Sequence, residues 1–248
     1  MSAAALFPPE IMLQTPSLQN NSSPKKIGDS IAPVVQASSV YAIDLNSGEP
    51  LYVQNIFEKR SIASITKLMT AMVILDSHTM DEVITVTSTA ANIEGSRMFL
   101  RQGERIRLDD TIRGLLINSG NDAGLALAIY DAGNEKNFVK KMNAKARMLG
   151  LQDTNFANPI GFDHPDAYST AYDVMHMALA AIQYPLIRET VSLKSATVRS
   201  VDAKYTHNLE TTNDLLKDTN FKVVGLKTGT TEAAGESVTS ILVAPNKH

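Results

Sequence analysis

Ser64 and Lys67 are the pair of residues whose types and spacing could do chemistry most directly. They stand three positions apart in SIASITKLMTAMVIL, residues 61–75, where the apolar run predicts a buried helix from about 64 to 77. Because residues i and i+3 of a helix face the same side, the hydroxyl and the amine can meet there. A serine needs a nearby base to become a nucleophile, and a desolvated lysine beside another cation can have a pKa low enough to be that base. The spacing also fits a serine that caps the helix and a lysine that reaches solvent, and this motif alone leaves both interpretations open.

A second polar motif, Ser119-Gly120-Asn121, falls between two predicted helices and is the only Ser-x-Asn in the chain. Serine, glycine and asparagine are ordinary residues where one helix ends and the next begins. The motif by itself therefore requires no function.

A third motif, Lys227-Thr228-Gly229, follows a stretch rich in β-formers. At the edge of a strand, the lysine and the threonine could bind a substrate carboxylate. Gly229, which has no side chain, would let a substrate backbone come close. The alternative is a plain strand that runs into a turn.

The elements that must position these motifs follow the order strands, helices, strands. Alternating residues predict strands near 39–45 and 50–54 around the turn NSGE, and β-rich runs return beyond residue 190 in FKVVGLKTG and GESVTSILVAP. Helices are predicted for RLDDTIRGLLINSG, NDAGLALAIYDA, EKNFVKKMNAKARMLG and STAYDVMHMALAAIQ. The order predicts an α/β (α+β) fold: an antiparallel sheet built from both ends of the chain and flanked by helices, with a mostly helical lobe from roughly 78 to 200.

Composition excludes several classes of function. The 248 residues carry a net charge of −3, which does not fit the basic surface of a nucleic-acid-binding protein. The chain has no cysteine, so disulfides, thiol catalysis and cysteine-ligated metals are excluded. The histidines are scattered and form no HExxH pair, so we expect no metal site and no cofactor.

Residues 1–36 are rich in proline and polar residues, and we expect a flexible tail or linker before a domain at 37–248. Ser22–Lys25 and Ser23–Lys26 repeat the Ser-x-x-Lys spacing in this tail, where no helix is expected. No apolar run approaches the roughly 20 residues of a membrane span, and the start lacks the pattern of a signal peptide. If the protein works outside the cytoplasm, its export signal is therefore expected to lie outside this chain.

Taken together, the three motifs resemble those of penicillin-binding proteins and active-site serine β-lactamases, in the same order and in fitting local contexts. The resemblance is most specific to the low-molecular-mass penicillin-binding proteins, the D-alanyl-D-alanine carboxypeptidases and related endopeptidases. It runs from about residue 38 to 244 and is carried by VYAIDLNSGEPLY, IASITKLMTAMVIL, INSGNDA, MNAKARMLGLQDTNFANPIGFD, YSTAYDVMHMA, NLETTNDLL and GLKTGTTEAAG. It implies a β-lactamase/transpeptidase-like fold.

The resemblance also implies a role for each catalytic position. Ser64 would attack the carbonyl between two D-alanines and form an acyl-enzyme, while Lys67 would take its proton. Ser119 would relay a proton toward the leaving D-alanine nitrogen. The backbone N–H groups of Ser64 and Thr230 would form the oxyanion hole, and water would then hydrolyse the acyl-enzyme.

The remaining positions would bind the substrate. Asn121 would hydrogen-bond the substrate peptide and help hold Lys67. Lys227 would keep the field of the site positive, and Thr228 with Thr230 would bind the terminal carboxylate. These roles predict a hydrolase that acts on peptidoglycan stem peptides in the bacterial cell envelope, with β-lactam antibiotics as covalent inhibitors.

Three alternatives stay open at this point. An endopeptidase that cuts peptidoglycan cross-links would use the same groups with more room around the leaving group. A β-lactamase is less favoured, because the stretch GLQDTNFANPIGFDHPDAYSTAYD has no glutamate of the kind that speeds deacylation. A non-catalytic protein that binds cell-wall peptide is the third, since the chain stops 19 residues after Gly229. The family continues there with a strand and a closing helix, which we expect to be missing here. We also expect any association with a membrane to use segments outside this chain.

Overall fold

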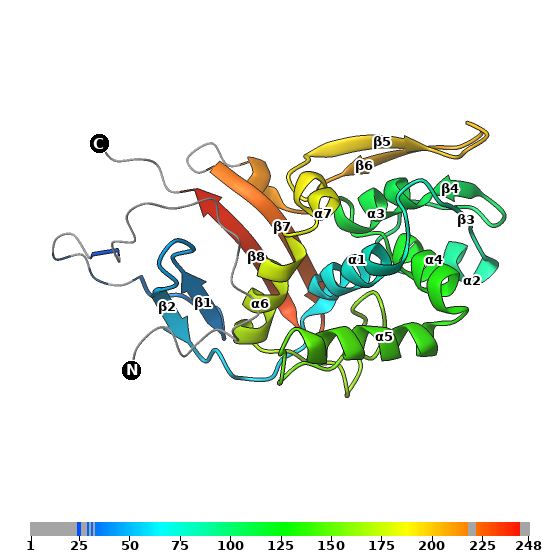
Figure 1. Ribbon diagram of the computed structural model, residues 1–248. Helices are drawn as coiled ribbons and strands as arrows, with labels where there is room; N and C mark the ends of the chain where they lie inside the picture. The colour runs from blue at the N-terminus through cyan, green and yellow to red at the C-terminus, as the bar shows by residue number, and fades with distance from the viewer. Residues whose placement is uncertain (1–23, 26–28, 30, 32, 218–221, 244–248) are drawn as a thin grey trace.

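The structure is a computed structural model that describes residues 24, 25, 29, 31, 33–217 and 222–243. Most of the predicted tail at 1–36 lies outside these residues, so that prediction is not tested. Four two-stranded antiparallel sheets and a group of helices make up the described chain (Figure 1). The strands are β1 (Val40–Ile43), β2 (Pro50–Gln54), β3 (Val83–Thr85), β4 (Arg105–Arg107), β5 (Ser195–Arg199), β6 (Thr206–Glu210), β7 (Lys222–Thr231) and β8 (Gly235–Val243). The helices are α1 (Thr66–Ser77), α2 (Ser88–Ala91), α3 (Leu108–Leu116), α4 (Asn121–Ala132), α5 (Glu135–Met148), α6 (Ala171–Ala181) and α7 (Pro185–Thr190), with short 3-10 turns η2 (Ala63–Ile65) and η3 (Asp214–Lys217).

The expected single sheet from both ends of the chain needs one correction. Within the described residues, β1 pairs only with β2 and β7 only with β8, and the two hairpins share no backbone ladder. Helix α6 contacts both β1 and β8 and so links the first hairpin to the last (Figure 1). The first and last hairpins are therefore brought together, as predicted, but both pack on α6 and do not form one sheet.

Helix α1 is the centre of the molecule. It contacts α3, α4, α5 and α6, and every residue from Thr66 to Ile74 is buried. A helix that is apolar on all sides belongs in a core, which explains why its sequence shows no polar stripe. The structure describes no helix that is both long and apolar enough to cross a membrane.

The helices between 78 and 200 begin and end close to the predicted signals. Helix α5 ends two residues before Gly150, whose φ of +72° is the left-handed conformation that terminates a helix. Helix α6 begins after Thr170, whose hydroxyl accepts the N–H of Asp173. Both helices thus have, at one end, the residue type that such a boundary favours.

The structure removes one interpretation of the Ser64–Lys67 pair. Ser64 lies in the 3-10 turn η2, and the residue before α1 is Ile65, which cannot cap a helix. Lys67 has no exposed surface at all, so its amine does not reach solvent. Because α1 is enclosed on every side, a lysine in its first turn cannot extend its amine into solvent.

Candidate active site

The start of α1 brings the predicted nucleophile and base into contact. Lys67 Nζ lies 2.6 Å from Ser64 Oγ and 2.9 Å from the backbone oxygen of Ile160. Ser64 is half-buried, whereas Lys67 is completely buried. The serine is thus open to a ligand on one side and touches an enclosed amine on the other.

Two buried lysines set the electrostatics of this site. Burial first, and then the nearby Lys227 ammonium, hold the pKa of Lys67 well below its usual 10.5, against an opposing effect of the Asp122 carboxylate. Burial lowers the pKa of Lys227 to about 7. Among the described residues, neither lysine forms an ion pair with a carboxylate. A neutral amine at Lys67 can accept a proton from Ser64, which a charged ammonium cannot.

Strand β7 closes the opposite side. Lys227 Nζ donates to the backbone oxygen of Thr228 at 2.8 Å, and the Thr228 hydroxyl lies 2.7 Å from that of Thr212. A Cβ at Gly229 would stand 2.8 Å from Ser64 N and 2.9 Å from Ala63 Cβ, so only glycine lets the strand lie this close to η2. Thr230, the next residue, is exposed.

The turn that holds Ser119 and Asn121 is fixed by the loop at 94–101. Asn121 Nδ2 donates to Glu94 O at 2.7 Å, and Asn121 N donates to Ser96 O at 2.7 Å. Ser119 is buried and has a φ of +60°, a strained conformation for a residue other than glycine. Such strain is often found where a side chain must be aimed at a site.

The amine of Lys67 has a different hydrogen-bond partner from the one expected. Asn121 was predicted to help hold Lys67, but the backbone oxygen of Ile160 is the second hydrogen-bond partner of Lys67 Nζ. The side chain of Asn158 fixes the loop that presents this oxygen, because its Oδ1 accepts the N–H groups of residues 160, 161 and 162 at 2.7–3.2 Å. The role of Asn121 toward substrate stays a prediction.

Sequence reasoning missed this loop at 158–163. A Cβ at Gly161 would lie 1.9 Å from Ala63 O, and φ there is +85°, so the loop packs directly on the turn that carries Ser64. The signal that could have found it is the Asn-Pro-x-Gly sequence at 158–161, in which a side-chain amide and a glycine shape a tight turn. Asp122, whose carboxylate acts on Lys67, was also missed.

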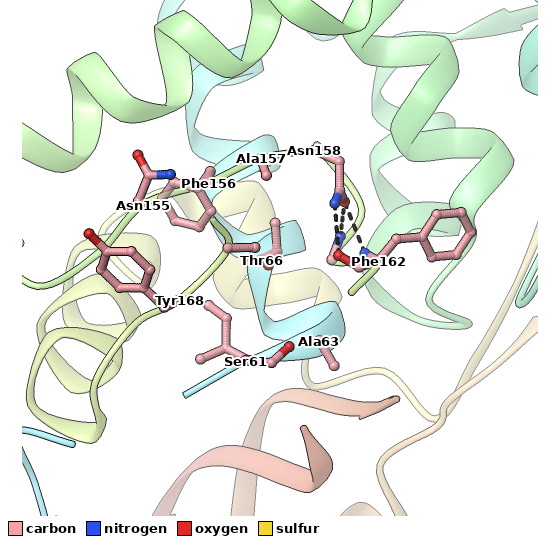
Figure 2. Close-up of a pocket in the computed structure, with 12 residues that line it drawn as sticks. Ser61, Ala63, Thr66, Asn155, Phe156, Ala157, Asn158, Phe162 and Tyr168 are labelled. Carbon is pink, nitrogen blue, oxygen red and sulfur yellow. Dashed lines mark hydrogen bonds between the residues drawn. The ribbon is translucent and has the colours of Figure 1, made fainter. Parts of the chain in front are cut away.

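A small pocket lies beside this turn and is lined by Ser61, Ala63 and Thr66 together with residues from 155 to 168 (Figure 2). Its free volume is about 10 Å³, at the limit of what one water needs. None of the eight predicted site residues lines it. In Figure 2 the Asn158 amide makes its bonds to the loop backbone. We therefore assign this pocket to the packing around the turn that carries Ser64, and the candidate site remains the region where Ser64 faces β7.

The arrangement combines an enclosed Ser–Lys pair, a strand that carries Lys-Thr-Gly and a Ser-Gly-Asn turn. This combination matches the three motifs of the penicillin-binding class, Ser-x-x-Lys, Ser-x-Asn and Lys-Thr-Gly. A family model described as D-alanyl-D-alanine carboxypeptidase matches residues 27–247. The chain belongs to that family, which confirms the resemblance stated above.

Relatives in the family are similar over most of this chain. D-alanyl-D-alanine carboxypeptidase DacD of Escherichia coli is 38% identical over 215 residues, which are 82% of this chain and 54% of that protein. A D-alanyl-D-alanine endopeptidase of Escherichia coli is 32% identical over 98% of this chain and 76% of its own length. The chain spans about half the length of the carboxypeptidases it matches.

Solved structures give the same fold. The Streptomyces K15 DD-transpeptidase has a TM-score of 0.80 at 27% identity, over 87% of this chain and 88% of that one. This likeness confirms the predicted fold class.

Proposed function

We propose that the protein is a serine-type D-alanyl-D-alanine carboxypeptidase that forms an acyl-enzyme at Ser64. The observation that carries this proposal is the 2.6 Å contact between Ser64 Oγ and the completely buried Lys67 amine, whose pKa is held low. Membership of the family and the likeness to DacD support the substrate class.

In the first half of the reaction, Ser64 Oγ attacks the carbonyl carbon between two D-alanines and its proton moves to Lys67 Nζ. The carbonyl oxygen becomes an oxyanion, which the N–H groups of Ser64 and Thr230 would stabilise. The loss of one such donor costs about 10²–10³ in rate in a comparable site. The C–N bond then breaks, and the terminal D-alanine leaves with a proton relayed through Ser119.

In the second half, a water molecule attacks the ester carbonyl of the acyl-enzyme and gives up its proton to the base. The Ser64 ester bond breaks, which returns the hydroxyl and releases the shortened stem peptide. Lys227, Thr228 and Thr230 would hold the terminal carboxylate during the first half, and Gly229 lets the peptide lie along β7.

A D,D-endopeptidase is the second candidate. It is favoured by a specific observation: the Escherichia coli endopeptidase aligns with 98% of this chain, against 82% for DacD. Both activities cut beside a D-alanine and would use the same residues. They differ in whether a free D-alanine or a cross-linked peptide leaves.

We infer that the partners are peptidoglycan stem peptides, with β-lactam antibiotics as covalent inhibitors, and that the protein acts in the bacterial cell envelope. A β-lactam mimics the D-alanyl-D-alanine amide, so the same serine would be acylated. The described residues from 149 to 173 offer no glutamate to speed hydrolysis, and the drug ester is therefore expected to persist.

The experiment that tests the proposal offers two substrates to the same protein. A defined stem pentapeptide and a cross-linked dimeric muropeptide are incubated separately, and the products are analysed by mass spectrometry. A carboxypeptidase shortens the pentapeptide by one alanine, whereas an endopeptidase splits the dimer. The Ser64→Ala variant is the control for a contaminating enzyme. Reversible binding of both peptides without cleavage or acylation would contradict the proposal and favour a cell-wall binding module.

A further inference from the structure

Asp163 makes three hydrogen bonds that join segments far apart in the sequence. Its Oδ1 accepts the hydroxyls of Thr231 at 2.6 Å and Ser61 at 3.1 Å, and its Oδ2 accepts the N–H of Ala233 at 3.1 Å. The carboxylate is exposed, yet both of its oxygens are engaged. Hydrogen bonds to an ionised acceptor are stronger than those between neutral groups.

These bonds start from the loop at 158–163, which is one wall of the proposed site, and reach the other two, the turn that carries Ser64 and the β7–β8 hairpin. Ser61 is two residues before η2, the turn that carries the nucleophile. Thr231 is the last residue of β7, directly after Thr230, and Ala233 lies in the turn to β8. Asp163 itself is the last residue of the loop whose Ile160 oxygen contacts Lys67 Nζ.

The turn η2, strand β7 and the loop at 158–163 are in close contact with one another. A Cβ at Gly229 would come within 2.8 Å of Ser64 N, and a Cβ at Gly161 would come within 1.9 Å of Ala63 O. The spacing between Ser64 N and Thr230 N therefore depends on how β7 lies against η2. A shift of about 1 Å in a catalytic group can cost about 10²-fold in rate.

We propose that Asp163 is a positioning residue that fixes the end of β7 against the turn of the nucleophile, and so sets the spacing of the two oxyanion-hole N–H groups. This inference rests on the function proposed above. The bond network is suited to that task because it holds β7 immediately beyond Thr230 on both sides of the turn, through Thr231 and Ala233.

The carboxylate acts through geometry and not by transferring a proton. The hydroxyl of Thr231, followed by the N–H of Ala233 and the hydroxyl of Ser61, holds the pKa of Asp163 below its usual 3.8, against burial. It stays ionised across pH 5–9. Its removal is therefore expected to lower the acylation rate equally throughout that range and to leave the pH profile, which the lysines control, in place.

The test compares Asp163→Ala with Asp166→Ala. Asp166 is an exposed aspartate three residues further along the chain, and its carboxylate lies 3.8 Å from His164 Nδ1 and bonds to none of the three walls. Acylation by a fluorescent penicillin is followed at several concentrations, which separates the dissociation constant of the first complex from the acylation rate constant. We expect Asp163→Ala to lower the rate constant about 10-fold or more while the dissociation constant changes less than about threefold. Asp166→Ala is expected to match the parent in both.

Two further variants keep the inference testable if Asp163→Ala folds poorly. Asp163→Asn can still accept the Ala233 N–H through its carbonyl, so it is expected to recover part of the lost rate. Thr231→Val removes the shortest bond. If Asp163 and Thr231 act through the same hydrogen bond, the losses in acylation rate constant caused by Asp163→Asn and Thr231→Val will not add in the double variant.

Several results would overturn the inference. They are an Asp163→Ala rate constant equal to the parent's, an equal fall in Asp166→Ala, or a displaced pH profile, which would mean that Asp163 acts on the charge of Lys67. A loss confined to melting temperature, with the parent rate in the folded fraction, would show a purely structural role. If the parent protein itself is not acylated, the proposed function fails first, and this inference fails with it.

Discussion

The candidate site and the contact between His207 of β6 and Glu104 both bury ionisable groups, but they do so in opposite ways. In the reaction site, Lys67 and Lys227 are enclosed without a carboxylate partner among the described residues, and both have lowered pKa values. In the second region, Nε2 of His207 in β6 lies 2.6 Å from Glu104 Oε1, and both side chains are buried. Burial lowers the pKa of His207, but the Glu104 hydrogen bond and charge outweigh it, and the net pKa is raised.

The paired region supports the unpaired one. His207 Nδ1 lies 2.8 Å from Met98 O, while Asp122 accepts the N–H groups of Met98 and Leu100 at 3.0 and 2.9 Å. The loop held in this way also accepts the N–H of Asn121 through Ser96 O. The hydrogen-bonded pair of His207 and Glu104 thus anchors the loop that fixes the Ser-Gly-Asn turn.

The comparison shows that burial of an ionisable group has a different effect in each region. A buried charge without a partner is costly, so a lysine there tends to lose its proton and becomes a base. A buried charge with a partner is stable as long as both members remain. The first arrangement is expected to trade stability for reactivity, and the second to contribute stability alone.

The largest effect is expected from Lys67→Met. Without the amine, Ser64 has no base, and acylation by penicillin should fall by at least about 10³-fold. The pKa of Lys67 is lower in the folded state than in the unfolded chain, so at pH 7, below the unfolded value, protonation favours the unfolded chain. Removing the amine should therefore leave the free energy of unfolding unchanged or raise it. Acylation kinetics and urea unfolding measure the two quantities. A variant that is acylated at near-parental rate would remove Lys67 as the base.

The next effect is expected from Glu104→Leu, which leaves His207 buried without its partner. Breaking a buried pair in this way costs about 3–5 kcal/mol of unfolding free energy. Replacing both residues with apolar ones, Glu104→Leu with His207→Phe, should restore much of that loss. Urea unfolding checks both, and a single variant as stable as the parent would contradict the assigned role of the pair.

The same pair predicts a pH dependence of stability. Because the pKa of His207 is raised in the folded state, its contribution is fully present below pH 6.5 and is lost as the pH rises through the higher folded value. Glu104→Leu is expected to flatten this part of the stability curve. An unchanged slope would mean that another group causes it.

A smaller effect is expected from Lys227, whose pKa is about 7. Below pH 7 it is a cation that attracts the carboxylate of a penicillin, and above pH 7 it becomes neutral. The dissociation constant of the first complex should therefore rise with pH, by up to about tenfold for each unit by which the bound carboxylate raises the pKa of Lys227. In Lys227→Met the dissociation constant should be large and should not change with pH. A parent protein with the same flat profile would contradict this role.

Much of this account could be predicted from the sequence, because the informative residues are local. Lys67, the Ser-Gly-Asn turn and Lys-Thr-Gly each lie on an element whose type follows from its own residues, whereas Ser64 lies in the 3-10 turn just before the predicted helix. The part that could not be predicted depends on contacts distant in sequence. The Ile160 oxygen on Lys67, the Asp163 bonds to Ser61 and Thr231, and the Glu104–His207 pair join residues 68 to 103 positions apart.

The most direct test of the central claim is mass spectrometry of the intact protein after incubation with penicillin, followed by peptide mapping. The account predicts one covalent adduct, located on Ser64, and none in a folded Ser64→Ala variant. An adduct that persists in that variant, or a parent protein that forms none, would contradict the assignment of Ser64 as the nucleophile.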